Sequence, residues 1–192
     1  MPETHPLLVK ALPLAEDLIK QDHFSIENLC HALDCGLKEL AEAAPTVDDL
    51  FMHINARFMG GYVDRARRTE AEAGDDGDKA KRLCAAWYDQ AVENRRLTKV
   101  LLQHHWSPGF VRPDWYMQRV KDCFVPVETV LARLAPKASP QFIAGAARGL
   151  YAQIVGLYFL TLNERATPAG IADQHRLLSL MVELVIKGLQ AA

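Results

Sequence analysis

The chain has 192 residues, 49% of them hydrophobic and 24% charged, an ordinary composition for a globular protein with one sizeable core or two smaller ones. Its formal net charge of −2 hides an asymmetry: residues 1–51 contain three lysines and ten acidic residues, whereas residues 52–192 contain 19 basic and 14 acidic ones. The longest apolar stretches, such as residues 150–162, are too short for a bilayer span, and the chain does not start like a signal peptide. We therefore expect a cytoplasmic protein with free cysteines and no association with a membrane.

The first quarter of the chain predicts three short helices. Apolar residues at helical spacing indicate a first helix over residues 7–20, in which Pro13 either marks the start or produces a kink. Ser25 can cap a second helix, and after a turn at residues 34–36 a third helix runs up to Pro45. Two short helices joined in this way are typical of a helix-turn-helix, which places its second helix in a DNA groove.

The remaining segments also have helical patterns. Thr46 and Asp49 resemble a capping box that opens a fourth helix, and the acidic residues 73–78 predict a loop. Further helices are expected over residues 79–93, 94–101, 113–131, 140–163 and 169–190, the last two opened by Ser139-Pro140 and Thr167-Pro168. No useful strand alternation is present, so we predict an all-α protein of eight or nine helices.

The order of these elements resembles the tetracycline-repressor (TetR) family of bacterial transcriptional regulators. Four segments carry the resemblance: ALPLAEDLIKQDHFSIENLCHAL (11–33), PTVDDLFMHI (45–54), AWYDQAVENRRLTKVLLQHHW (86–106) and ARGLYAQIVGLYFLTL (147–162). The resemblance implies a helix-turn-helix head over residues 1–51 and a helical body over residues 52–192. In the family, the body binds a ligand and dimerises through its last two long helices.

The head departs from the family pattern at two positions that contact DNA and at one that anchors the third helix in the core of the head. Its third helix has Ala41 and Ala44 where the family has an aromatic residue and a phenylalanine, and Val47 stands where a lysine commonly grips a phosphate. Neutralising phosphates supplies most of the affinity for DNA. Because residues 1–51 are strongly acidic, we expect DNA binding to be weak or lost.

The resemblance assigns possible contacts with duplex DNA to Ser25, Asn28, Lys38 and Thr46. Simpler structural roles compete with this assignment. Serine and threonine at these positions can cap helices, and Lys38 can pair with Glu42 one turn later.

Aromatic residues of the body are candidates for a pocket that binds an apolar small molecule, since such pockets are mostly apolar with a few polar groups. Aromatic residues at helical spacing are also common in ordinary cores. The candidates are Trp87, Tyr88, His104, Trp106, Trp115, Tyr116, Phe124 and Tyr151.

The two C-terminal helices are strongly apolar and form either internal core or half of a four-helix bundle between two copies. The family resemblance favours the second arrangement, a two-fold homodimer. The residues expected at its interface are Leu150, Ile154, Leu157, Leu177, Leu180 and Leu184.

No pattern for catalysis, a cofactor or a metal is recognisable. Glu27 and His31 share a helix face, but the chain has no zinc-site spacing, no Gly-rich phosphate loop and no nucleophile elbow. We therefore expect no enzymatic activity. The leading hypothesis is a TetR-like, ligand-responsive transcriptional regulator with weak or lost DNA binding. The alternatives are a small-molecule or lipid-binding protein without DNA binding, and an interaction module whose acidic head docks a basic partner.

Overall fold

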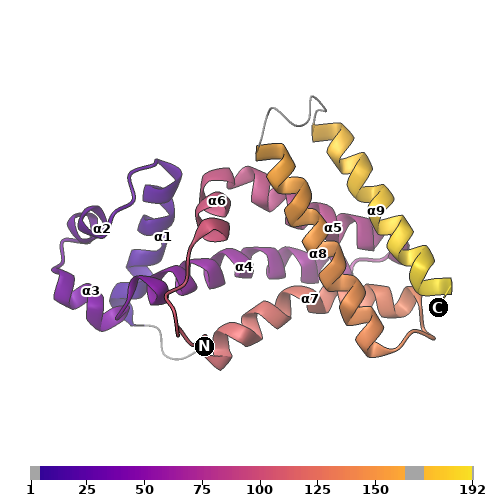
Figure 1. Cartoon of the computed structure of the whole chain (residues 1–192), viewed down its shortest axis with the longest axis horizontal. Coiled ribbons are helices and arrows are strands. Elements are labelled where there is room, and N and C mark those ends of the chain that lie inside the picture. Colours follow the sequence, from indigo (N-terminus) through magenta and orange to yellow (C-terminus); the bar gives the residue numbers. More distant parts are fainter. Residues whose placement is uncertain (1–4, 163–170, 192) are drawn as a thin grey trace. The chain divides into compact units, whose positions relative to one another are not determined.

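The computed structural model describes residues 5–162 and 171–191, and its regular secondary structure within those ranges is entirely α-helical (Figure 1). The helices are α1 (Pro6–Lys20), α2 (Ile26–Leu33), α3 (Leu37–Ala43), α4 (Val47–Ala71), α5 (Asp76–Glu93), α6 (Arg95–Gln103), α7 (Asp114–Leu134), α8 (Pro140–Leu162) and α9 (Ile171–Ala191). The all-α prediction is thus confirmed for the described part of the chain. The cap predicted at Thr167-Pro168 lies outside it.

Two compact units make up the chain, each built from two stretches of sequence. The head unit comprises Met1–Gly60 and Asn94–Val120, and the body unit comprises Gly61–Glu93 and Lys121–Ala192. The head unit therefore contains α6 and the first turns of α7 in addition to the first helices. This division differs from the single boundary expected after residue 51. The reason is that residues 94–120, although later in the chain, pack with the first helices.

The head unit is held together by one apolar core, and α1 packs against α2, α3 and α6. Leu97 of α6 is 1% exposed within this core. A guanidinium nitrogen of Arg96 donates to the backbone carbonyl of Lys20 at 2.8 Å, at the end of α1. The buried residues of this core are Leu8, Ala11, Leu12, Ala15, Ile19, Leu29, Cys30, Leu40, Ala44, Leu50, Phe51, Ile54 and Leu97.

The first helix begins at Pro6 and continues through Pro13. Pro6 occupies the first turn, where a missing N–H costs nothing, and His5 Nδ1 accepts a hydrogen bond from the first turn of the helix at 3.3 Å. Ala11 and Leu12 beside Pro13 are buried. Burial of this face offsets the hydrogen bond that proline removes from the helix interior.

The turn between α2 and α3 has the predicted spacing. Asp34 ends α2 with a left-handed φ of 51°, a conformation that aspartate tolerates better than most residues. Gly36 precedes α3, and its backbone N–H donates to the carboxylate of Glu39 at 2.7 Å. Glu39 therefore holds the start of α3, a role that the sequence pattern did not reveal.

Aspartate carboxylates define two further helix starts. Thr46 and Asp49 form the predicted capping box: Asp49 N donates to Thr46 Oγ1 at 3.1 Å, and Thr46 N donates to Asp49 Oδ2 at 3.0 Å. In the segment predicted as a loop, Asp75 Oδ1 accepts from Asp78 N at 3.0 Å, so that α5 already begins at Asp76.

In the body unit, α5 packs against both α8 and α9, and α8 packs against α9 (Figure 1). Arg133 near the end of α7 links the end of α4 to the start of α5. Its Nε lies 3.0 Å from Asp76 Oδ2, and a second guanidinium nitrogen lies 2.9 Å from Glu70 Oε1. The Arg133 guanidinium holds the pKa of the Asp76 carboxyl below its ordinary value.

The helix α8 corrects the expectation that every apolar stretch is too short to cross a membrane. Among the described residues, Pro140–Leu160 is long and apolar enough to do so by length and composition. However, Leu150 and Ile154 are buried within the body unit, and the exposed surface of the same helix carries Arg148 and Gln153. A charged residue at the centre of a bilayer costs about 3 kcal/mol. These features are those of a core helix with one outward face.

Candidate functional site

Three of the four residues assigned to DNA contact have local structural roles in the head unit. Ser25 Oγ accepts a hydrogen bond from Asn28 N at 3.0 Å as the cap of α2, and Asn28 Nδ2 donates to the His23 carbonyl at 2.7 Å. Thr46 belongs to the capping box of α4. These roles account for the serine and threonine without DNA.

Lys38 is exposed on the first turn of α3. No ion pair joins it to Glu42 in the part of the chain that the structure describes, so the simpler role considered for this lysine is not observed. The surrounding surface is apolar and acidic: Leu37 is 60% exposed, and Ala41 and Glu42 are exposed beside it. Since phosphates are bound by cations and N–H groups, α3 presents a poor surface for DNA.

Four of the predicted pocket residues, His104, Trp106, Trp115 and Tyr116, lie in the head unit and not in the body. The ring of His104 stacks on Phe51, with centroids 4.3 Å apart and an interplanar angle of 10°. Trp106 packs edge-on against His104 at 4.8 Å. These rings fasten the segment after α6 onto the start of α4.

Asp48, 4% exposed, is the polar anchor of this cluster. Its Oδ2 accepts a hydrogen bond from Ser107 N at 2.9 Å, and its Oδ1 lies 2.7 Å from His104 Nε2. Hydrogen bonds from Ser107, followed by that from His104, hold the pKa of the Asp48 carboxyl below its ordinary value. A buried carboxylate paired in this way has a structural role that explains these residues without a ligand.

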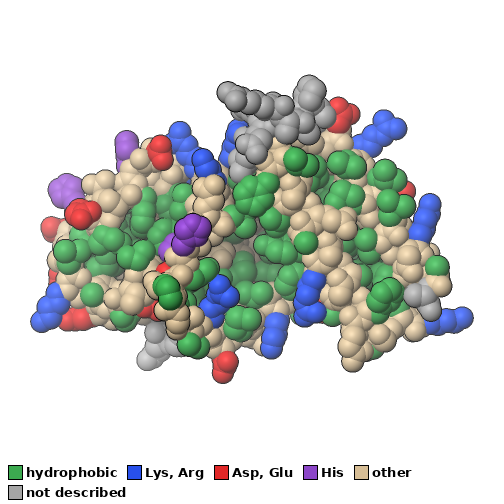
Figure 2. Space-filling view, in the orientation of Figure 1, with side chains coloured by type: hydrophobic (Ala, Val, Ile, Leu, Met, Phe, Trp, Pro, Cys, Tyr) green, Lys and Arg blue, Asp and Glu red, His purple; other side chains and the backbone are tan. Residues whose placement is uncertain are grey.

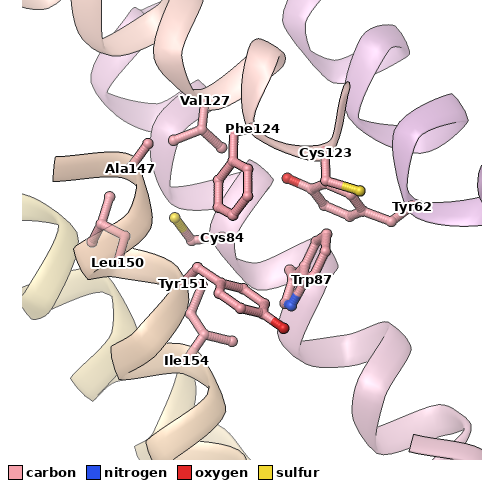
Figure 3. A pocket seen from close by; sticks show the side chains of 10 residues that line it. All are labelled: Tyr62, Cys84, Trp87, Cys123, Phe124, Val127, Ala147, Leu150, Tyr151 and Ile154. Carbon is pink, nitrogen blue, oxygen red and sulfur yellow. The ribbon is translucent and has the colours of Figure 1, made fainter. Parts of the chain in front are cut away.

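The other four predicted pocket residues lie in the body unit, and three of them line a cavity between α4, α5, α7 and α8 (Figure 3). Tyr88 is the exception, because it is fully buried and contacts His175. The complete lining is Tyr62, Cys84, Trp87, Cys123, Phe124, Val127, Ala147, Leu150, Tyr151 and Ile154.

Aromatic rings nearly fill this cavity. Trp87 packs edge-on against Tyr62 and Tyr151, with centroids 4.1 and 5.0 Å apart, and Phe124 packs edge-on against Tyr151 at 5.7 Å. The remaining volume is about 20 Å³, enough for one water molecule. A larger ligand would therefore have to displace these rings.

The hydroxyl of Tyr62 is the notable polar group of the cavity. The residue is 3% exposed, and its oxygen points toward Phe124 among the lining side chains (Figure 3). No hydrogen bond to this hydroxyl is present within residues 5–162 and 171–191. Burial, reinforced by the Cys84 and Cys123 thiols, raises the pKa of Tyr62 above its ordinary value, so the hydroxyl is neutral and can both donate and accept.

A neutral hydroxyl on the lining of an apolar cavity can hydrogen-bond to a polar atom of a ligand that enters it, which makes Tyr62 a candidate polar contact of this site. Sequence reasoning missed this residue because it fell on the apolar stripe of α4. The available signal was a polar tip on an otherwise apolar helix face. Burial also raises the pKa of the neighbouring Cys84 thiol to about 12, so this thiol is protonated and a poor nucleophile.

The two helices of the predicted dimer interface have different surroundings. Leu150, Ile154 and Leu157 are at most 5% exposed and face the core of their own unit, so the prediction that they contact a second copy is wrong. In contrast, Leu177, Leu180 and Leu184 on α9 are 45%, 50% and 60% exposed.

The outward face of α8 is formed by different residues. Phe142 and Leu160 are 49% and 48% exposed, and Gly145, Gly149 and Gly156 follow the same helical stripe between them. A Cβ added at any of these glycines would meet nothing within 4 Å. Figure 2 shows hydrophobic side chains at the surface over α8 and α9.

Glu27 and His31 are both exposed on α2. Within the described ranges, no group of three or more histidine, cysteine, aspartate or glutamate side chains is placed to hold a metal ion. The expectation that the protein uses no metal stays a prediction.

Comparison with known proteins identifies the fold. The sequence matches no protein-family model and no curated protein. The structure resembles that of a protein with unknown function from Rhodococcus sp. RHA1, with a TM-score of 0.74, 15% identity and 99% of both chains covered. It also resembles the crystal structure of the "putative regulatory protein SCO4313", with a TM-score of 0.66, 15% identity and 97% of this chain and 96% of that chain covered. The chain thus shares a complete all-helical fold with these two proteins.

Proposed function

We propose that this protein is a TetR-like, ligand-responsive transcriptional regulator whose head binds duplex DNA weakly. The observation that carries the proposal is the arrangement of α2, the turn at residues 34–36 and α3, which leaves the outer face of α3 exposed. The full-length fold similarity to the "putative regulatory protein" adds support. The family resemblance of the sequence points the same way.

Weak binding follows from charge. Residues 1–51 contain ten acidic residues against three lysines, and α3 contains a single lysine. Few phosphates can then be neutralised, so both the affinity and its salt dependence should be small. A second copy that supplies another head would increase the affinity for a two-fold operator.

The test is fluorescence anisotropy with two labelled duplexes, one from the upstream region of the gene and one of random sequence, at low and moderate salt. We expect preferential binding to the upstream duplex that weakens as salt rises. Absence of binding to either duplex at low salt would overturn the regulator proposal.

A gain-of-function variant tests the geometry of the head separately. Glu42→Lys, Ala41→Tyr and Val47→Lys change three exposed residues and leave Glu39, which caps α3, in place. Each new phosphate contact should add about 0.9 to the slope of log affinity against log salt. Asp64→Lys, at an exposed position of the body unit, is the control for added charge. A folded triple variant that binds DNA no better than this control would refute the helix-turn-helix assignment.

The body cavity is the proposed ligand site. A small apolar molecule with one polar atom would form a hydrogen bond with the Tyr62 hydroxyl. Its contacts with the lining rings would replace the contacts that these rings now make with one another. The same helix, α4, carries Tyr62 and the head-core residues Leu50 and Ile54, so displacement of α4 by a ligand would alter the support of the head. Acetophenone and ethylbenzene form a probe pair of similar shape, and only the former has a hydrogen-bond acceptor. Acetophenone should raise the melting temperature more, and Tyr62→Phe should remove this difference.

We further propose that two copies associate through the outward faces of α8 and α9. The exposed leucines of α9 supply apolar area, and the glycines of α8 allow a second backbone to approach closely. Sedimentation of Leu180→Glu with Leu184→Glu should show a monomer. Val125→Glu, at a position 49% exposed on α7, is the matched control and should leave the dimer intact. A wild-type monomer would refute the proposal.

A second candidate function, small-molecule or lipid binding without DNA binding, is favoured by the apolar and acidic surface of α3. This function predicts that acetophenone raises the melting temperature and that neither DNA duplex binds. If the head instead docks a basic protein, neither the rise in melting temperature nor duplex binding is expected. No catalytic activity is proposed.

A further inference from the structure

Two cysteines meet at the turn that joins α2 to α3. Cys30 lies near the end of α2, and Cys35 follows that helix shortly before α3 begins. Both pack in the head core: Cys30 is 7% exposed, and Cys35 is partly buried against the same cluster. The functions proposed above use neither side chain, so an inference about this pair is independent of DNA binding and of the ligand of the body cavity.

The backbone of this turn determines how the two side chains meet. Cys35 N donates to the Cys30 carbonyl at 3.1 Å, and Asp34 N donates to the His31 carbonyl at 3.2 Å. Asp34 has a left-handed φ of 51°. These two hydrogen bonds and this dihedral define a Schellman motif, in which the residue after the left-handed one commonly contacts the residue whose carbonyl it binds. The motif therefore brings the side chains of Cys30 and Cys35 together.

The two thiols interact directly. A hydrogen bond joins the side chains of Cys35 and Cys30. A thiol is a weak donor and a weak acceptor, so this bond adds little stability. It shows instead that the two sulfur atoms are neighbours, on a backbone that two hydrogen bonds hold in place. A disulfide requires such neighbours, because it cannot join side chains that point apart.

An apolar contact is the simplest role for this pair. Hydrophobic residues often occupy these two positions of a Schellman motif, and a free cysteine behaves as a small hydrophobic residue. Two thiols differ from two aliphatic side chains because they can be oxidised to a sulfur–sulfur bond. Their exposure also differs: solvent reaches Cys35, whereas Cys30 is buried. An oxidant would therefore meet Cys35 first.

We propose that Cys30 and Cys35 form a modification site, at which a small disulfide such as oxidised glutathione converts the two thiols to an intramolecular disulfide. The Cys35 thiolate attacks one sulfur of the oxidant, whose sulfur–sulfur bond breaks, and the first glutathione leaves as a thiolate that takes up the proton lost by Cys35. The Cys30 thiolate then attacks the Cys35 sulfur of the mixed disulfide. The second glutathione leaves and takes up the proton lost by Cys30. Two cysteine thiols are oxidised, and one oxidised glutathione is reduced to two thiols.

The surroundings of Cys35 slow this reaction without opposing its product. Partial burial, followed by the Cys30 thiol and the carboxylates of Glu39 and Asp34, raises the pKa of the Cys35 thiol above its ordinary value. The attacking thiolate is therefore scarce at neutral pH. The disulfide is uncharged, so the carboxylates do not disfavour it. We expect an equilibrium that favours the disulfide, reached at a rate that Cys35 limits.

The disulfide closes a covalent ring over residues 30–35 and so restrains the turn between α2 and α3. The backbone amides of Asp34 and Cys35 donate the two hydrogen bonds of the Schellman motif. Their hydrogens should exchange more slowly in the oxidised protein than in the reduced protein, because opening of the turn is restricted. Equal exchange in the two forms would refute this effect on the turn.

Equilibration of the full chain with mixtures of reduced and oxidised glutathione tests the proposal, with acid quenching and peptide mass mapping as the readout. At a fixed glutathione ratio, the ratio of disulfide to dithiol at this pair should be at least about tenfold higher in native protein than in urea, because folding holds the two sulfurs together. Reactions started from reduced and from oxidised protein should reach the same ratio. Cys84 and Cys123 are internal controls, since both are buried and should remain thiols in the native protein.

A matched pair of variants tests the order of the two steps. Cys30→Ala keeps the first step and loses the second, so Cys35 should accumulate a mixed disulfide with one glutathione. Cys35→Ala removes the accessible thiol, and Cys30 should remain unmodified because it is buried. Each variant replaces one small hydrophobic side chain by another, and circular dichroism checks that both are folded.

Four results would overturn the proposal: no disulfide in the wild type at equilibrium, a disulfide that joins another pair or two chains, a native ratio no higher than that in urea, or equal glutathione adducts in the two variants. If a variant does not fold, the peptide map of the wild type and the comparison with urea decide the matter.

Discussion

Truncating Leu97 should destabilise the head unit even though this residue lies far from the first helices in sequence. Leu97→Ala removes three carbon groups from a side chain that is 1% exposed. At about 0.8 kcal/mol for each buried carbon group, the transfer contribution is about 2.4 kcal/mol, and the cavity left behind adds to it. We therefore expect the free energy of unfolding to fall by about 3–4 kcal/mol.

Leu102→Ala is the internal control, because it makes the same change on the same helix at a side chain that is 37% exposed. Leu102→Ala should lower the free energy of unfolding by less than about 1 kcal/mol. Urea unfolding followed by circular dichroism gives both free energies. Native-state hydrogen exchange then shows where protection is lost, and Leu97→Ala should lower it in α1 as well as in α6.

Equal losses in the two variants would refute the assignment of Leu97 to the head core. So would a Leu97→Ala variant in which α6 loses protection and α1 keeps it. In either case the single boundary after residue 51 would describe the chain better than the two-stretch division.

Three further predictions concern buried polar groups. Tyr62→Phe removes a hydroxyl that has no hydrogen bond among the described residues, so urea unfolding should show a free energy of unfolding unchanged or raised by about 1 kcal/mol; a loss of that size would mean that the hydroxyl is satisfied. Asp48→Asn should destabilise the head at neutral pH. Because the folded pKa of Asp48 is lowered, its contribution is complete above the unfolded value of about 3.9 and is lost as pH falls through the folded value, so wild type and variant should converge in acid. Cys84 is buried and its pKa is raised to about 12, whereas Cys35 is partly exposed, so iodoacetamide should alkylate Cys84 more slowly than Cys35 in the native protein, and mass spectrometry should find the two equal in denaturant.

Local signals predicted the helix starts well. The capping box at Thr46 and the start after Ser139 are confirmed, and the turn between α2 and α3 has the expected spacing. Each of these features depends on atoms within about four residues, which a sequence lists directly. The start of α5 was predicted at residue 79, too late by three residues, because a run of acidic residues is typical of a loop. In the structure Asp75 caps the helix, which begins at Asp76.

The candidate sites were predicted less well, because helical periodicity identifies an apolar stripe without identifying what covers it. The aromatic residues proposed as one pocket divide between two units: Trp87, Phe124 and Tyr151 line the body cavity, whereas His104 and its neighbours brace the head.

The sequence by itself determined the all-helical class, the short helices with their turn, and the acidic charge of the first 51 residues. These properties follow from nearest neighbours, capping chemistry and composition. Only the tertiary structure decided that α6 completes the head, that Leu150, Ile154 and Leu157 face inward, and that Leu177, Leu180 and Leu184 face outward. The physical reason is that burial depends on contacts between segments distant in sequence, and two equally apolar stripes become core or surface according to which one finds a partner.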